Sequence, residues 1–160
     1  MSDVAARQQI HDALLSYCRG IDRLDPAAVA AAFHPDAQLI DYGPETLTIE
    51  TFAEYAVGSL GKRFRATQHR IGNTAIEFDG DRALVETYVL AYHVEPTDDG
   101  DVLHTFSGRY IDRFELRDGA WLIASRTLRN DWSKVEPIAA PMRGAWVASG
   151  RGGSPDPIYD

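Results

Sequence analysis

The strongest constraint on the fold of this chain is a set of four long strand-like segments in its second half, separated by short turns. Asp79-Gly80 and Asp118-Gly119 are dipeptides that favour tight hairpin turns. A polar loop at residues 96–100 is expected to make the remaining connection. The predicted strands cover residues 64–78, 82–95, 102–116 and 120–132. Consecutive strands joined by short turns predict an antiparallel meander.

The first half of the chain has the spacing of helices. Apolar residues recur at helical intervals from Ile10 to Leu24, so we expect a first helix that begins near Ser2 or Asp3 and ends near Leu24. Three further elements are expected before the meander: a short helix over residues 27–33 that starts at Asp25-Pro26 and is closed by His34-Pro35-Asp36, a short strand over residues 38–42, and a third helix from Thr48 or Glu50 to Gly61.

Helices followed by a meander predict an α+β domain, in which a cone-shaped, curved antiparallel sheet wraps around three N-terminal helices. Such a cone leaves a pocket between the concave face of the sheet and the helices. The 160 residues suit one domain with a single core. We expect residues 1–135 to form that domain and residues 136–160 to form a partly mobile C-terminal extension.

Charge and cysteine content exclude several functional classes. The net charge of −8 argues against nucleic acid or an anionic membrane as a partner. The single cysteine, Cys18, rules out an internal disulfide and is interpreted as a small buried hydrophobic residue of the first helix. The sequence contains no export signal and no apolar run of membrane-spanning length, so a cytoplasmic location is expected.

The sequence predicts neither a metal nor a cofactor. No two histidines have the spacing of a helical metal site, and the chain has no cysteine cluster. It also lacks a glycine-rich phosphate loop and a nucleotide-binding fingerprint. Any chemistry is therefore expected to come from the side chains of the protein itself.

An ionisable residue, His69, lies in the first long predicted strand at a position where an apolar or neutral residue would be usual. A neutral imidazole is a good general base, and a carboxylate such as Asp22 would fix its tautomer and stabilise the imidazolium that forms. Such a pair can remove a proton next to a carbonyl group. The alternative is a structural histidine with a satisfied hydrogen bond, and the spacing alone leaves both interpretations open.

His93 lies in register with Val89 and Ala91 on the second long predicted strand, which suggests that its side chain faces the core. It would then be available to protonate a leaving hydroxyl group. The alternative is an ordinary histidine near the end of a strand.

Three further side chains are candidates for a pocket. Tyr42 and Tyr17 would donate hydrogen bonds to a substrate carbonyl, although buried tyrosines are more often core residues. Arg126 alternates with Leu122, Ala124 and Leu128, so it shares an apolar face and needs either a carboxylate, such as Asp22, or an anionic substrate group as its partner.

Aromatic residues are abundant for a domain of this size, and a subset is expected to line the pocket. They would suit a flat, apolar substrate such as an aromatic polyketide, a terpenoid or a steroid-like ring. The aromatic residues predicted to bind substrate are Phe33, Tyr55, Phe106, Tyr110 and Trp132.

Several of these segments resemble a known superfamily. The segment Thr67-Gln68-His69-Arg70-Ile71-Gly72, the triplet Ile40-Asp41-Tyr42, the hairpin Asp118-Gly119-Ala120-Trp121 and the helical segment from Tyr17 to Asp22 are similar to the nuclear transport factor 2-like superfamily. Within it, the chain resembles the SnoaL-like and scytalone dehydratase-like branch over residues 10–132. The resemblance implies a cystatin-like α+β barrel.

The resemblance also implies a function: a cofactor-free lyase, most simply a dehydratase, with a small hydrophobic carbonyl compound as substrate. Asp22 and His69 would be the base pair, Tyr42 and Tyr17 would hold the oxyanion, and His93 would protonate the leaving hydroxyl group. An arginine at the position of Arg126 accompanies a similar pair in lindane dehydrochlorinase. The chain departs from the scytalone dehydratase pattern at Ile21, Gly108 and Tyr110, so scytalone itself is not the expected substrate.

Two other functions stay open at this stage. The same pocket would serve a ketosteroid-isomerase-like isomerase or a cyclase, and a non-catalytic module that binds a small ligand or a partner would need no charged pair at all. Apolar residues on the outer face of the predicted sheet, Tyr88, Leu90 and Tyr92, predict a homodimer or homotrimer through that face.

Overall fold

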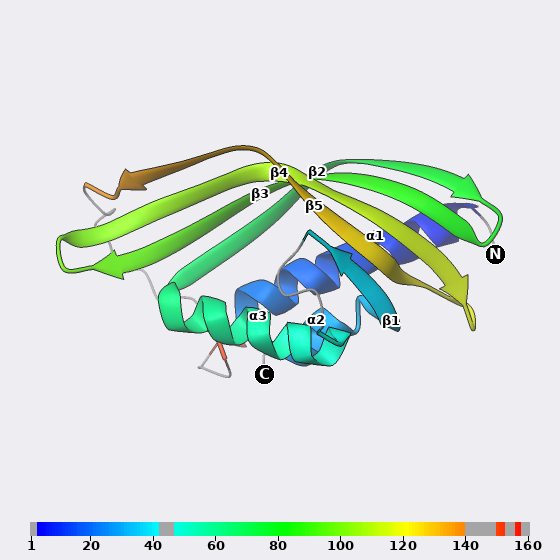
Figure 1. Cartoon of the computed structure of the whole chain (residues 1–160), viewed down its shortest axis with the longest axis horizontal. Coiled ribbons are helices and arrows are strands. Elements are labelled where there is room, and N and C mark those ends of the chain that lie inside the picture. Colours follow the sequence, from blue (N-terminus) through cyan, green and yellow to red (C-terminus); the bar gives the residue numbers. More distant parts are fainter. Residues whose placement is uncertain (1–2, 42–46, 140–149, 153–155, 158–160) are drawn as a thin grey trace.

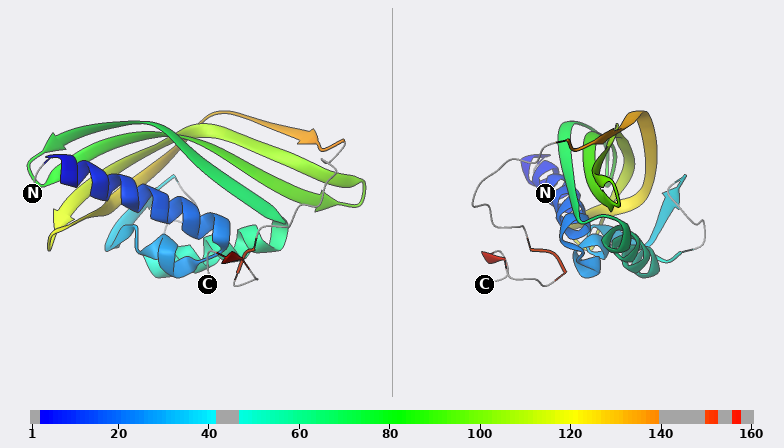
Figure 2. Two further views of the ribbon diagram at one scale, coloured as in Figure 1. Left: turned by 180° about the vertical axis from the view of Figure 1, so that it is seen from behind. Right: turned by 90° about the vertical axis from the view of Figure 1, so that its left-hand side faces the viewer.

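The computed structural model describes residues 3–41, 47–139, 150–152 and 156–157. Three helices are followed by a meander of four long strands, and one short strand lies between the second and third helices (Figure 1). The predicted α+β class is confirmed: the helices lie together against the concave side of a curved sheet that does not close into a barrel (Figures 1 and 2).

The first helix, α1 (Asp3–Arg23), ends where the sequence predicted. Its buried stripe includes Ile10, Leu14, Tyr17 and Ile21, which pack against the sheet. Arg23 is followed by Leu24, which adopts a left-handed conformation with φ 57°, so the chain turns sharply out of the helix.

The second and third helices differ from their predicted lengths. The second, α2 (Pro26–Ala30), is shorter than expected; the side chain of Asp25 accepts a hydrogen bond from the Ala28 N–H at its start. The third, α3 (Ile49–Arg63), begins after its cap Thr48 and continues past Gly61, which was wrongly predicted to stop it. A glycine inside a helix costs only about 1 kcal/mol relative to alanine, which tertiary packing readily offsets.

The first strand corrects the prediction for residues 33–42. β1 (Phe33–Ile40) contains His34, Pro35 and Asp36, which were expected to close a helix. β1 is an edge strand paired in parallel with the last strand, and its register shifts between Phe33 and Gln38. Proline is tolerated there because an edge strand has backbone N–H groups that need no sheet partner.

The four long strands of the meander are β2 (Ala66–Asp79), β3 (Arg82–Thr97), β4 (Gly100–Arg117) and β5 (Ala120–Pro137). The sheet order is β1-β5-β4-β3-β2, and the pairs within the meander are antiparallel. Two strand ends differ from the prediction. The expected polar loop at residues 96–100 is mostly strand, because Thr97 pairs with Gly100, and β5 continues beyond Trp132.

An irregularity in β5 decides which of its side chains face the core. Arg113 pairs with Ser125 and Phe114 pairs with Ile123, so Ala124 is an extra residue in β5. This bulge reverses the alternation along the strand. Ile123 and Arg126 are therefore both buried, and the predicted face shared by Arg126 with Leu122 and Ala124 was wrong.

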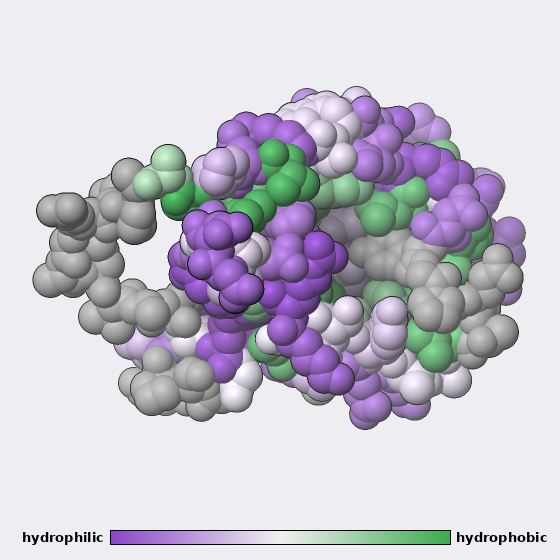
Figure 3. Space-filling view, turned by 60° about the vertical axis from the view of Figure 1, so that its left-hand side comes forward, coloured by the Kyte–Doolittle hydropathy of each residue, from purple (hydrophilic) through white to green (hydrophobic). Residues whose placement is uncertain are grey.

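The core lies between α1 and the middle of the sheet, where Val85, Val89, Phe114 and Ile123 are buried. Hydrophilic side chains dominate the outer surface seen in Figure 3, with smaller apolar areas between them. No helix among the described residues is long and apolar enough to cross a membrane.

Candidate active site

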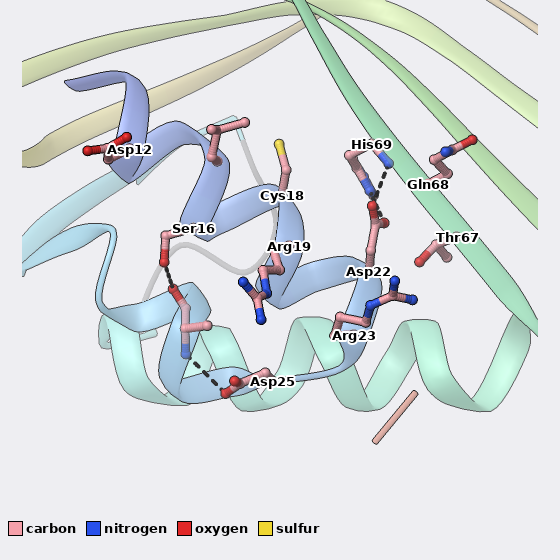
Figure 4. Close-up of a pocket in the computed structure, with 12 residues that line it drawn as sticks. Asp12, Ser16, Cys18, Arg19, Asp22, Arg23, Asp25, Thr67, Gln68 and His69 are labelled. Atoms are coloured by element: carbon pink, nitrogen blue, oxygen red, sulfur yellow. Dashed lines mark hydrogen bonds and ion pairs between the residues drawn. The ribbon is translucent and has the colours of Figure 1, made fainter. Parts of the chain in front are cut away.

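Asp22 and His69 meet at the junction of α1 and β2. The Asp22 carboxylate binds His69 twice: Oδ1 lies 2.8 Å from the ring Nδ1, and Oδ2 accepts the backbone N–H of His69 at 2.8 Å (Figure 4). Both side chains are largely shielded from solvent, with 9% of the His69 and 17% of the Asp22 side chain exposed.

The two hydrogen bonds between Asp22 and His69 follow from the positions of α1 and β2. β2 is an edge strand, so alternate backbone N–H groups face away from the sheet, and α1 runs along that edge. Asp22 lies in the last turn of α1, which brings its carboxylate to the N–H of His69. With Nδ1 donating to the carboxylate, Nε2 is the basic nitrogen of the ring.

An apolar pocket of about 480 Å³ lies between α1, α3 and the concave face of the sheet, and His69 forms part of its wall. Most of its remaining wall is aromatic or aliphatic. The described residues that line it are Tyr17, Ile21, Asp41, Phe52, Tyr55, Ala56, Ser59, Leu60, His69, Ala91, His93, Phe106, Tyr110 and Leu128. Its size and lining suit a compact apolar molecule with one or two polar groups.

His93 lies beside His69 in this pocket, on the neighbouring strand β3. The two rings meet edge to face with their centroids 5.3 Å apart. The ring centroid of Phe64 lies 4.9 Å from that of His93. Burial, as the larger cause, and the nearby His69 ring together lower the pKa of His93 to about 4. His93 is therefore neutral near pH 7 and can donate or accept a hydrogen bond there.

The structure brings six of the candidate residues to one place. Tyr17, Tyr55, Phe106 and Tyr110 line the pocket together with His69 and His93. Asp22 lies behind His69. Tyr42, which was predicted to hold the oxyanion, lies outside the described residues, and only its neighbour Asp41 is seen at the pocket wall.

Two of the predicted aromatic residues are not part of the pocket. Phe33 is buried at the start of β1, where it packs edge to face against Tyr17 and Phe52. β5 has a second irregularity between Asn130, which pairs with Gly108, and Trp132, which pairs with Ser107. Trp132 is 51% exposed. This irregularity adds an extra residue to β5, which turns Trp132 away from the pocket.

Arg126 pairs with Asp112 rather than with Asp22. Its Nε and Nη2 atoms each lie 2.8 Å from a carboxylate oxygen of Asp112, and both side chains are fully buried. The guanidinium lies 4.3 Å from the Tyr17 ring and 4.0 Å from the Tyr110 ring. Arg126 therefore supports two pocket-lining tyrosines from behind.

Sequence reasoning missed three polar residues that line the pocket or lie behind its wall. Asp112 alternates with Tyr110 and Phe114 on β4, and this pattern would have indicated a buried carboxylate. Ser59 and Asp41 line the pocket, and Asp41 is held by Arg129, whose Nη1 lies 3.0 Å from its Oδ2. No sequence pattern links residues so far apart as Asp41 and Arg129.

A second, larger hollow of about 930 Å³ lies on the opposite face of α1, and His69 borders it as well (Figure 4). Its wall includes Asp12, Arg19, Arg23 and Asp25, and it reaches the back of Asp22. The charged wall of this hollow favours water, so the smaller pocket with its apolar wall is the better site for chemistry that needs a dry base. Within the described residues, no group of three or more His, Cys, Asp or Glu side chains is arranged to hold a metal ion.

The chain matches the family model for the SnoaL-like domain over residues 2–127. No curated protein matches it.

Solved structures share the fold at low sequence identity. A candidate scytalone dehydratase from Novosphingobium aromaticivorans DSM 12444 is 22% identical with a TM-score of 0.70, over 96% of this chain and 97% of the other. A hexachlorocyclohexane dehydrochlorinase (LinA) Type2 is 20% identical with a TM-score of 0.76, over 89% and 97%. A protein of unknown function with a cystatin-like fold from Nostoc punctiforme PCC 73102 is 20% identical with a TM-score of 0.63, over 78% and 90%. These likenesses confirm the predicted fold.

Proposed function

The chain belongs to the SnoaL-like domain family, and from this premise we propose that it is a cofactor-independent lyase, most simply a dehydratase, acting on a small hydrophobic carbonyl compound. The observation that supports the proposal most is the Asp22–His69 pair in the wall of an apolar pocket of about 480 Å³. A partly buried carboxylate bonded to Nδ1 leaves Nε2 as a base facing the substrate.

In this proposal the substrate is a β-hydroxy carbonyl compound. His69 Nε2 takes the proton from the α-carbon, and the electrons of that C–H bond form an enolate. The enolate collapses to a carbon–carbon double bond as the C–O bond to the β-hydroxyl breaks. The departing hydroxide takes the proton back from the His69 imidazolium, so water leaves and the base is regenerated.

His93 has a different role here from the one expected from the sequence. Because its pKa is about 4, it carries no transferable imidazolium proton near pH 7. It acts instead as a neutral hydrogen-bond donor to the substrate. The Tyr17 hydroxyl, at the pocket wall, is the candidate donor to the enolate oxygen, with Tyr42 as a second candidate outside the described residues.

The test uses hydrophobic β-hydroxy ketones and thioesters as probes, with loss of water read by mass spectrometry. His69→Ala should lower the rate on any turned-over probe by roughly 10²–10⁴-fold, the usual contribution of a general base. His11→Ala, a change at an exposed histidine of α1, is the matched control and should be neutral. A His69→Ala rate within a few-fold of the wild type would rule out the proposal.

The single Asp22–His69 base also suits a second candidate, a double-bond isomerase. An isomerase needs one base that moves a proton between two carbons, and no separate acid for a leaving group. The reaction would leave the mass of the probe unchanged, whereas dehydration removes water. Probes that bind without any conversion, equally well in wild type and His69→Ala, would indicate a ligand-binding module instead.

A further inference from the structure

Two backbone carbonyl groups at the end of α1 accept hydrogen bonds from another part of the chain. Leu24 N–H donates to Ile21 O and Asp25 N–H donates to Gly20 O, the pattern of a Schellman turn. The last turn of a helix has four carbonyl groups that its own N–H groups do not reach, and those of Asp22 and Arg23 are two of them.

Both donors come from a segment near the C-terminus. Gly152 N–H donates to Arg23 O at 2.8 Å, and Arg151 Nε donates to Asp22 O at 3.2 Å. Figure 2 shows this part of the chain beside the end of α1. These residues lie beyond residues 2–127, the part that matches the family model.

Arg151 also reaches the strand that bears His69. Its Nη1 donates to Phe64 O at 2.8 Å and its Nη2 to Thr67 Oγ1 at 3.4 Å. Phe64 and Thr67 flank the start of β2, and His69 follows two residues after Thr67. One guanidinium thus bonds to the helix that carries Asp22 and to the start of the strand that carries His69.

We propose that Arg151 is a positioning residue that sets the spacing between Asp22 and His69. It acts through the backbone of Asp22 and the start of β2, and it touches no substrate. Its effect on catalysis rests on the function proposed above, whereas its effect on the geometry of the pair does not. The C-terminal segment is accordingly part of the working site.

Contacts other than those of the Arg151 side chain hold residues 150–152 in place. Arg23 Nη1 donates to Gly150 O at 3.3 Å, and Gly150 N–H donates to the Asp156 carboxylate at 2.9 Å. Gly152 has a φ of 59°, a conformation that glycine adopts without strain. Changing the Arg151 side chain therefore tests its bonds while leaving the other anchors in place.

The first readout needs no substrate. The backbone N–H of His69 donates to Asp22 Oδ2, so its hydrogen exchange, followed by NMR in the full-length protein, reports on the pair directly. Arg151→Ala should speed this exchange by roughly tenfold or more, because charge-assisted hydrogen bonds are lost. Arg151→Lys keeps the charge but loses the planar arrangement of donors. Its His69 exchange rate should therefore lie between those of the wild type and Arg151→Ala.

The matched control is Arg65→Ala. Arg65 also lies at the start of β2, but its guanidinium pairs with Asp101, so His69 exchange should stay at the wild-type rate. The amide of Val89, in the core of β3, reports global stability. If Arg151→Ala destabilises the whole protein, hydrogen exchange will be faster at both His69 and Val89. The comparison of wild type with Arg151→Lys is then the test. His69 exchange within twofold of the wild type in both Arg151 variants would overturn the proposal.

The second readout is catalytic and separates the two proposals. On a turned-over probe, Arg151→Ala should lower kcat by roughly tenfold with KM nearly unchanged, because the pair is loosened and the pocket is not. If wild type turns over no probe while Arg151→Ala speeds His69 exchange, the enzyme proposal fails and the positioning role stands. If His69→Ala abolishes turnover while both Arg151 readouts stay at wild-type values, the positioning role fails alone.

Discussion

Arg126 and Asp112 form a two-bond ion pair in which both side chains have no solvent exposure, beneath the rings of Tyr17 and Tyr110. Burial raises the pKa of Asp112, and the Arg126 guanidinium opposes part of that rise. A buried pair of this kind contributes little net stability, but removing one partner leaves the other charge buried alone.

Asp112→Ala should therefore lower the free energy of unfolding by about 3–5 kcal/mol, measured by urea denaturation. The double variant Asp112→Leu with Arg126→Met removes both charges and should recover most of that loss. A cost below about 1 kcal/mol for Asp112→Ala would mean that Arg126 finds another carboxylate.

The buried His93 should make the protein less stable in acid. The unfolded chain binds a proton at His93 below its ordinary pKa of 6.5, whereas the folded protein keeps the ring neutral down to about pH 4. Between these values the unfolded state holds more protons, so stability falls as the pH falls. From pH 7.5 to pH 5 the contribution of His93 to this loss is about 2 kcal/mol.

His93→Gln should remove that contribution, so its urea midpoint should change less between pH 7.5 and pH 5 than the wild-type midpoint does. His11→Gln, at an exposed position of α1, should follow the wild type. Parallel pH profiles for wild type and His93→Gln would contradict the assignment.

Cys18 should be unreactive in the native protein. Burial raises its pKa to about 12, and the thiolate is the reactive form of cysteine. At pH 8 iodoacetamide should label the native protein roughly a thousandfold more slowly than the urea-unfolded chain. Native labelling within tenfold of the unfolded rate would show that α1 opens readily, and Cys18→Ala gives the background.

Much of the fold follows from local sequence patterns. The order of elements follows from the turns at Asp79-Gly80 and Asp118-Gly119 and from the apolar spacing of α1. Asp22 lies near the end of α1 and His69 near the start of β2, and the fold brings these two places together. Edge strand β2 needs an acceptor for its outward N–H groups, and the end of α1 supplies one.

The errors arise where structure depends on pairing between distant residues. The bulge at Ala124 lies in the pairing of β5 with β4, and in that pairing Arg126 stands directly opposite Asp112. The end of β5, from Ser133, is mostly exposed on both faces, so it has no alternation to predict. Arg151 bonds mainly to backbone groups, which no residue pattern can reveal.

The outer face of the sheet supports the proposal of a homodimer or homotrimer. Tyr88 is 48% and Trp132 51% exposed, and Trp132 stands in the row of Leu90, because both pair with Ser107. Apolar side chains gathered on one sheet face are typical of an interface between subunits. Light scattering after size-exclusion chromatography should therefore give a multiple of 17.7 kDa at micromolar concentration.

Tyr88→Glu removes an aromatic ring from that face and adds a carboxylate opposite Arg109, which Glu86 and Asp131 already neutralise. The variant should shift the protein towards the monomer, because the added charge is costly to desolvate in an interface. Val4→Glu replaces an exposed apolar residue of α1, on the helix layer, and should leave the molar mass unchanged. A wild-type monomer at these concentrations would exclude the assembly, and an unaltered oligomer with Tyr88→Glu would move the interface to another surface. Loss of assembly from Tyr88→Glu alone would identify the outer face as the contact.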